Sequence, residues 1–201
     1  MILSTHNNEG KYNGFAKAVR IITIPPILVS ILVASVYMFA EGVFKNAYEA
    51  FLTAFFLGIF PVLAYPFQKI IPSLKSKGRV LQRKLAFVFT IIGYFAGMIW
   101  VNICDVSENT RLIVFSYFFA SLILAALNVF TKIKASGHSC SATGVLIYTI
   151  YFFGAAAILL DIVIAVLIVW SSLKLKRHTA LELFWGAVPS ITAFIVGYII
   201  M

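Results

Sequence analysis

Residues 139–170 read SCSATGVLIYTIYFFGAAAILLDIVIAVLIVW, an apolar stretch of 32 residues in which Asp161 is the one charged residue. As a single helix this stretch would be about 48 Å long, well beyond a hydrocarbon core of about 30 Å. As two helices with a turn near residues 154–157, each helix would have about 15–17 residues and would be short for a span. The number of spans depends on whether the stretch turns back, and hydropathy alone leaves both alternatives open.

The composition of the whole chain is typical of an integral membrane protein. Of its 201 residues, 62% are hydrophobic and 11% are charged, and the mean hydropathy is +0.99. Runs of about 20 apolar residues mark candidate spans. Besides 139–170, they are residues 18–40, 51–67, 85–103, 112–130 and 181–201. We expect a single membrane domain with a polar tail at 1–17, four spans within 18–130 and three more within 131–201.

The distribution of charge favours a turn within residues 139–170. With seven spans and the N-terminus inside, 14 of the 16 Lys and Arg residues fall on the cytoplasmic side, as the positive-inside rule requires. An unbroken helix would instead move Lys174, Lys176 and Arg177 outside. The loop at 68–84, which has six cations and no acid, points the same way. We therefore predict an all-α bundle of about seven transmembrane helices with the C-terminus outside.

Other features of the sequence have ordinary explanations. The cytoplasmic loops account for the net charge of +9, so we expect no nucleic-acid partner. Cys104 and Cys140 are expected to be free thiols, because two distant cysteines give neither a disulfide framework nor a zinc pattern. Asp161 is expected at the turn on the outer side, and Pro25-Pro26 is expected to kink or end a helix.

Polar side chains gather in two loops, 131–139 and 171–177, which seven spans would place on the same face of the membrane. His138 would open the fifth span and His178 the seventh, near helix N-termini whose unpaired N–H groups favour anions. Glu182 lies four residues after His178, on the same helix face. A carboxylate there can hold one ring nitrogen of the histidine and leave the other available as a nucleophile.

The residues just before His138 are suited to binding an anion. Lys134 supplies a positive charge and Ser136 supplies a hydroxyl group. Gly137 supplies a backbone that a ligand can approach closely, because glycine has no side chain. Together with the two histidines, these residues predict an anion site at the ends of buried helices, where polar groups are costly to keep.

Two motifs give a resemblance to a known family. Residues 135–138 read A-S-G-H, and from Ser171 the chain reads S-S, five residues, His178, three residues and Glu182, with Gly186 beyond. This pattern resembles the type 2 phosphatidic acid phosphatase superfamily of membrane lipid phosphatases, whose motifs are P-S-G-H and S-R-x-x-x-x-x-H-x-x-x-D. The 32 residues between the motifs are about what that family uses for a helical hairpin. The resemblance covers residues 132–201 and implies a phosphatase-type helical core.

The resemblance implies a hydrolase that needs neither a metal ion nor another cofactor. His178 would attack phosphorus and form a phosphohistidine, Glu182 would orient it, and His138 would protonate the leaving oxygen. The residues expected to bind the phosphoryl group are Lys134, Ser136, Gly137, Ser171 and Arg177. The substrate would be a lipid phosphate or diphosphate of the polyprenyl or phosphatidate class. In contrast to familiar members, this chain would have its site on the cytoplasmic face of the cell membrane.

The chain departs from the family pattern at two places. Ser172 stands where the family has an arginine that grips phosphate, and the first motif, K-x-x-x-x-x-x-R-P, is absent. Lys134 resembles a variant branch in which a K-x-S-x-H element replaces the first motif. Arg177, Lys176 or Lys132 could supply the missing positive charge, although Lys and Arg are not equivalent at bidentate sites. The alternative is a catalytically degenerate protein of the same fold that binds or transports a lipid phosphate.

Overall fold

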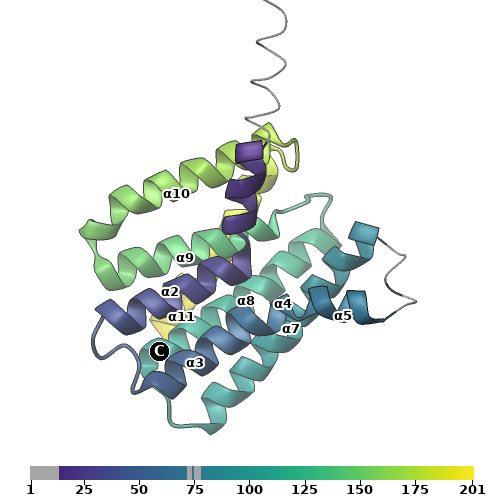
Figure 1. Ribbon diagram of the computed structural model, residues 1–201. Helices are drawn as coiled ribbons and strands as arrows, with labels where there is room; N and C mark the ends of the chain where they lie inside the picture. Colours follow the sequence, from purple (N-terminus) through teal and green to yellow (C-terminus); the bar gives the residue numbers. More distant parts are fainter. Residues whose placement is uncertain (1–13, 72–73, 75–77) are drawn as a thin grey trace, which may run out of the picture.

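The computed structural model describes residues 14–71, 74 and 78–201, and all regular secondary structure in this part of the chain is helical (Figure 1). The prediction of an all-α protein is thus confirmed for the described residues. Most of the predicted polar tail lies outside them, as do Lys75 and Lys77 of the basic loop.

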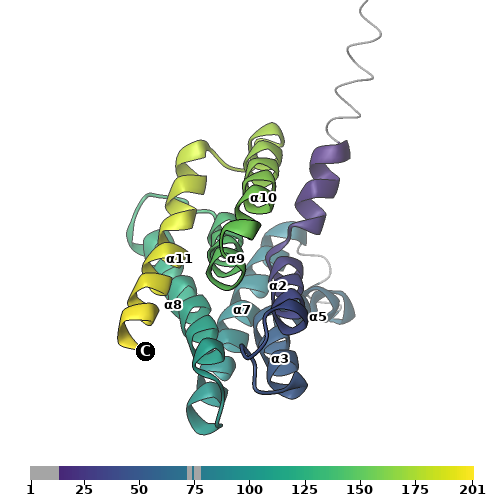
Figure 2. The ribbon, with the colours of Figure 1, turned by 90° about the vertical axis from the view of Figure 1, so that its left-hand side faces the viewer.

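The helices follow one another with short connections. A first helix at Gly14–Ile22 precedes the labelled elements. These are α2 (Pro25–Phe39), α3 (Ala47–Ala54), a π-helical turn η1 (Phe55–Ile59), α4 (Phe60–Val62), α5 (Ala64–Ile70), α7 (Gly78–Ile103), α8 (Glu108–Phe130), α9 (Gly137–Phe153), α10 (Ala155–Lys174) and α11 (Ala180–Ile200). Figure 2 shows α11 running alongside α8 and α9, the two helices on which it packs most extensively.

Five helices of the described chain are long and apolar enough to cross a membrane. They are Ala47–Ile70, Lys84–Ile103, Glu108–Phe130, Ala155–Lys174 and Ala180–Ile200. A sixth results if Gly14–Ile22 and α2 are counted together as one broken span. Helix α9, with 17 residues, falls just below the 18 residues of a candidate span. The chain is therefore an integral membrane protein with five or six candidate spans, and a seventh stays a prediction.

The long apolar stretch does turn back on itself. Helix α9 ends at Phe153 and α10 begins at Ala155, with Gly154 between them. Gly154 has φ 62° and ψ −145°, a conformation that is almost closed to residues with a Cβ. The two helices pack against each other. The predicted hairpin is therefore present. Gly154 provides the break between the two helices, which the hydropathy pattern did not indicate.

The first predicted span, 18–40, is not one helix. The chain is helical from Gly14 and bends by 53° before α2 begins at Pro25. Ile24 has an extended backbone with ψ 141°, as expected for a residue that precedes a proline. Pro25-Pro26 then provides no N–H groups to continue the earlier helix. The proline pair was expected to interrupt a helix, and the consequence is that Gly14–Ile22 takes its own direction (Figure 2).

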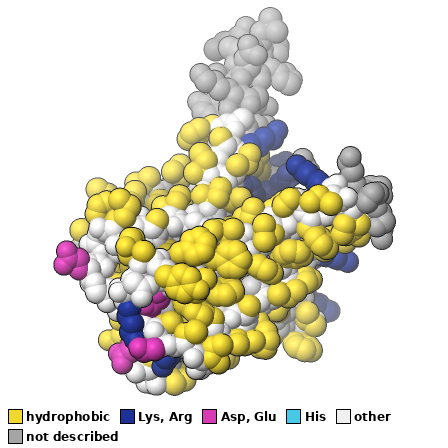
Figure 3. Space-filling model, turned by 60° about the horizontal axis from the view of Figure 1, so that its bottom comes forward, with side chains coloured by type: hydrophobic (Ala, Val, Ile, Leu, Met, Phe, Trp, Pro, Cys, Tyr) yellow, Lys and Arg dark blue, Asp and Glu magenta, His cyan; other side chains and the backbone are white. Residues whose placement is uncertain are grey.

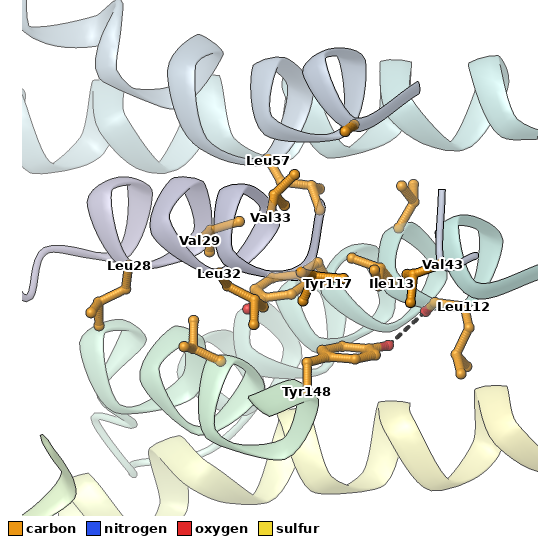
Figure 4. Packing of buried hydrophobic residues seen from close by; sticks show 14 of the residues in the cluster. Leu28, Val29, Leu32, Val33, Val43, Leu57, Leu112, Ile113, Tyr117 and Tyr148 are labelled. Atoms are coloured by element: carbon orange, nitrogen blue, oxygen red, sulfur yellow. Dashed lines mark hydrogen bonds between the residues drawn. The ribbon is translucent and has the colours of Figure 1, made fainter. Parts of the chain in front are cut away.

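The core lies where α2, α8 and α9 meet. Val29 and Val36 of α2 and Val114 of α8 are fully buried within it. Tyr148 of α9 is 1% exposed, and its hydroxyl donates to the Leu112 carbonyl oxygen at 2.9 Å (Figure 4). A hydroxyl group buried in this way is stabilised because its hydrogen-bonding capacity is used. The contact ties α9 to α8.

The outer surface is largely apolar, as expected for a protein surrounded by lipid. In Figure 3 hydrophobic side chains cover most of the visible face, and the acidic side chains that it shows lie at one edge. Leu159 and Leu160 of α10 are 75% and 60% exposed. Exposed leucines in such numbers would be a liability in water and are normal against acyl chains.

Asp161 does not lie at the turn where it was expected. It is the seventh residue of α10, is 4% exposed, and accepts a hydrogen bond from Thr149 of α9 at 2.7 Å. The turn is at Gly154, which places Asp161 about two helical turns further along the span. Among the described residues, Thr149 satisfies one oxygen of the carboxyl group, and the other, Oδ1, is buried without a hydrogen-bond partner.

Candidate functional site

The two motif regions lie directly against each other. The Ser136 N–H donates to the Glu182 carbonyl oxygen at 2.9 Å, and the Ser139 hydroxyl donates to the Leu183 carbonyl oxygen at 2.7 Å. Ser136 also caps α9 by accepting from the Ser139 N–H at 3.3 Å. The start of α9 and the start of α11 are thus joined by one bond between backbone groups and one bond from a serine side chain to the backbone.

Gly186 permits this close approach. A Cβ atom at position 186 would lie 2.4 Å from the Ser136 carbonyl oxygen and 3.0 Å from the Ser136 nitrogen. Both neighbours are backbone atoms, which cannot rotate away as the end of a flexible side chain can. The presence of glycine at position 186, one helical turn after Glu182, is therefore explained by steric contact with the backbone of Ser136.

His178 is held by Glu182 in the turn before α11. Its Nδ1 atom lies 3.0 Å from Glu182 Oε2, and its side chain is 12% exposed. The same carboxylate oxygen accepts from the Thr179 N–H at 3.1 Å, and Thr179 Oγ1 accepts from the Glu182 N–H at 3.2 Å, which completes a capping box. Because an ionised carboxylate can only accept, this contact favours a proton on Nδ1, and Nε2 is the ring nitrogen that does not face Glu182.

His138 occupies the first turn of α9 and is contacted by the N-terminal helix. Its Nε2 atom lies 3.2 Å from Thr23 Oγ1, and the Thr23 hydroxyl itself donates to the Val19 carbonyl oxygen at 2.8 Å. Since that hydroxyl has one proton, it accepts from His138 Nε2–H. The Ser136 N–H bond to the Glu182 carbonyl oxygen joins the segments that carry His138 and His178, so the two histidines, 40 residues apart in the sequence, lie at the same end of the bundle.

Arg20 is the functional candidate that the sequence reasoning missed. Its Nη1 atom donates to Ser172 Oγ at 3.0 Å, although the two residues are 152 positions apart. Arg20 is also close enough to act electrostatically on His138. The ring centroids of Phe15 and Trp170 are 5.6 Å apart and add a second contact between the same two segments. No sequence spacing indicates this contact, because it depends on how the bent N-terminal helix lies against α10.

The remaining predicted residues divide into buried and exposed. Ser171 is fully buried, and its hydroxyl donates to the Ile168 carbonyl oxygen at 3.1 Å within its own helix. Lys134 is exposed and close enough to Glu182 to interact with it electrostatically. Gly137 is exposed, and a Cβ atom there would meet Leu124 at an ordinary 3.5 Å, so packing does not demand glycine at this position.

The three cations considered as substitutes for the missing arginine are all exposed. They are Arg177, Lys176 and Lys132. In the turn after α10, the Arg177 N–H donates to the Ser172 carbonyl oxygen at 3.0 Å, and Lys176 has φ 50°. The side chain that contacts Ser172 comes instead from Arg20.

This cluster holds side chains and backbone groups of the kinds that bind anions. It combines two imidazoles, an imidazole-bound carboxylate, the cations Arg20 and Lys134, and the N-terminus of a helix. Within the described residues, no three His, Cys, Asp or Glu side chains gather in a way that could hold a metal ion.

Neither the known protein families, nor the curated proteins, nor the solved structures gave a match to this chain. The class that the fold and the site define is an all-helical integral membrane protein with a polar cluster where α9 begins, α10 ends and α11 begins.

Proposed function

We propose that this protein is a membrane lipid phosphatase that hydrolyses the phosphate monoester or diphosphate of a lipid through a phosphohistidine on His178. The observation that carries the proposal is the His178–Glu182 contact of 3.0 Å, with Glu182 itself held by the Thr179 N–H. A carboxylate fixed in this way orients the imidazole and balances the positive charge that the ring gains as it attacks.

The reaction would proceed in two displacements. His178 Nε2 attacks phosphorus, the bond from phosphorus to the lipid oxygen breaks, and His138 supplies the proton that this oxygen needs. Water then attacks the phosphohistidine, His138 takes a proton from it, and inorganic phosphate leaves. Because His138 Nε2 contacts Thr23, Nδ1 is the ring nitrogen that would exchange the proton in this reaction. Transfer of this kind demands mainly positioning and charge stabilisation, which a rigid cluster of cations and imidazoles provides.

A groove beside α2 supports a substrate with an apolar tail. It has a volume of about 370 Å³ and is lined by Pro26, Ile27, Ser30, Ile31, Ala34, Gly58, Ile59 and Val62. Its α2 residues begin three positions after Thr23, which contacts His138, and continue along the helix. Ser30 is the one hydroxyl residue of the lining, and its side chain donates to the Pro26 carbonyl oxygen at 2.8 Å. An isoprenoid or acyl chain suits such a surface.

The test is release of inorganic phosphate by the purified full-length protein in detergent micelles. Dioleoyl phosphatidate, a polyprenyl phosphate and a polyprenyl diphosphate are assayed with EDTA present and with water-soluble p-nitrophenyl phosphate as the tail-free comparison. We expect release from at least one lipid without added metal, and little from p-nitrophenyl phosphate. Binding of a lipid phosphate without any release would contradict hydrolysis and favour the lipid-phosphate binder or transporter instead.

The cytoplasmic placement of the site is part of the proposal. It requires that α9 counts as a span and that the bent pair Gly14–Ile22 and α2 crosses once, which gives seven spans. Residues 131–136 and 174–178 carry five Lys and Arg residues and no acid, the excess expected of cytoplasmic loops.

Placement is tested with a reporter fused after Met201. In a bacterial inner membrane, we expect alkaline phosphatase at this position to be active and green fluorescent protein to be dark, because the C-terminus would be outside. The same reporters placed before residue 1 should give the reverse result. Fluorescence from both the N-terminal and the C-terminal fusion would show that the number of spans is even and would contradict the seven-span placement.

A further inference from the structure

We propose that Arg20 of the N-terminal helix is the phosphate-binding arginine of this site, which takes the place of the arginine that Ser172 replaces in the chain. The inference rests on the proposed function and deepens it. On this inference, the helix Gly14–Ile22 contributes a substrate-binding residue to the site and does not serve only as the first part of a membrane span.

The first argument is position. Arg20 Nη1 lies 3.0 Å from the hydroxyl oxygen of Ser172, which is fully buried. An arginine at position 172 would project its own guanidinium from the backbone at this point. Arg20, 152 residues away in the sequence, therefore places a guanidinium group next to residue 172.

The second argument is that the N-terminal helix reaches the reacting groups as well. Thr23 lies three residues after Arg20 and contacts His138 Nε2 at 3.2 Å. Thr23 directly follows the helix end at Ile22, and its N–H still donates to the Val19 carbonyl oxygen at 2.9 Å, so it keeps the helical spacing from Arg20 and lies on the same face. At the other end of the helix, Phe15 packs on Trp170 with ring centroids 5.6 Å apart. These three contacts hold the helix against α10 and the start of α9.

The third argument is chemical. A guanidinium is planar, stays charged, and can donate two parallel N–H bonds to a phosphoryl group, whereas a lysine acts as a point charge. Arg20 is close enough to His138 to act on it electrostatically. A phosphoryl group bound beside Arg20 would bring negative charge to His138 and so favour the protonated imidazole that the proposed reaction needs. The exposed Lys134 would then add a second, less directional positive charge near Glu182.

The experiment moves the guanidinium from one segment to the other. The full-length variants are Arg20→Ala, Arg20→Lys, the double variant Arg20→Ala with Ser172→Arg, and the control Lys17→Ala. Lys17 is an exposed cation on the same helix, so its loss changes the net charge equally. We expect Arg20→Ala to lower kcat/KM for the best lipid of the panel by about 10- to 100-fold, as for the loss of a charged hydrogen bond. Arg20→Lys should recover part of this loss, the double variant most of it, and Lys17→Ala should match the wild type.

Two readouts separate this inference from the proposed function. The first readout is kcat/KM. If Arg20→Ala has the kcat/KM of the wild type and only a lower melting temperature, the inference is wrong and Arg20 has a structural role. The second is the dissociation constant for dioleoyl phosphatidate in mixed micelles. If the wild type binds but does not hydrolyse, a tenfold weaker Kd in Arg20→Ala upholds the arginine and refutes the hydrolase. Equal Kd values would refute the arginine, and a wild type that neither binds nor hydrolyses lipid phosphates would refute both.

Discussion

Replacement of His178 by alanine is expected to reduce phosphate release to background, a fall of at least about 10³-fold in kcat. The reason is that no other group in the proposed reaction can form the covalent intermediate. Trapping with a radiolabelled lipid phosphate should give an acid-labile, base-stable phosphoenzyme in the wild type and none in this variant. Full activity in His178→Ala would refute the mechanism.

Replacement of Glu182 by glutamine is expected to lower activity less than replacement of His178. Glutamine keeps the size of the side chain and can serve in the capping box, but it cannot balance the charge of an imidazolium. We expect kcat to fall by about 10²- to 10⁴-fold, as is typical when the carboxylate of a triad is neutralised. The variant should still bind lipid phosphate, because the substitution leaves the phosphate-binding groups in place.

The matched control for both variants is Thr179→Ala. Thr179 Oγ1 accepts from the Glu182 N–H at 3.2 Å, so the substitution removes a cap of α11 without removing the carboxylate. We expect a loss of about 1 kcal/mol in the free energy of unfolding and only a small change in kcat. A loss of activity in Thr179→Ala as large as that in Glu182→Gln would mean that the carboxylate acts only through helix capping.

Gly186→Ala is expected to damage both the fold and the site. The new Cβ atom would lie 2.4 Å from the Ser136 carbonyl oxygen, so α9 and α11 would have to move apart. That movement would weaken the Ser136 N–H bond to the Glu182 carbonyl oxygen, which is 2.9 Å long. Overpacking of this kind costs about 1–3 kcal/mol. We expect a lower melting temperature in detergent and a loss of phosphate release.

Gly197→Ala in the same helix is the matched control. A Cβ atom at Gly197 would approach Leu112 and Phe115 at 2.9 and 3.0 Å, but these neighbours are side-chain atoms that can give way. Both substitutions gain the same helix propensity, about 1 kcal/mol, so the difference between the two variants reports the backbone contact. Equal stability of Gly186→Ala and Gly197→Ala would show that the approach of α9 to α11 does not depend on glycine.

The sequence predicted much of the local structure correctly. The hairpin near 154–157, the interruption at Pro25-Pro26 and the contact between His178 and Glu182 were all foreseen. Each depends on residues that are close in the chain, so spacing and residue type are sufficient to indicate it. The two motifs were also expected to lie together, and the Ser136 N–H bond to the Glu182 carbonyl oxygen joins the segments that carry His138 and His178.

Other features were beyond the reach of the sequence. Asp161 was placed at the turn, and its burial beside Thr149 became evident only when α9 and α10 were packed. Ser171 was assigned to phosphate, yet its hydroxyl donates to Ile168 inside its own helix. A serine near a motif can face the site or its own backbone, and its rotation about the helix axis relative to its neighbours decides which.

By itself, then, the sequence determined a helical membrane protein, the hairpin, and the histidine, carboxylate and glycine positions of the two motifs. It did so because hydropathy, helix periodicity and short spacings are local properties of a chain. Only the tertiary structure decided that Arg20 lies beside Ser172 and Thr23 beside His138. Those contacts join residues 152 and 115 positions apart, and they exist because a proline-broken helix is free to take its own direction against α10 and α9.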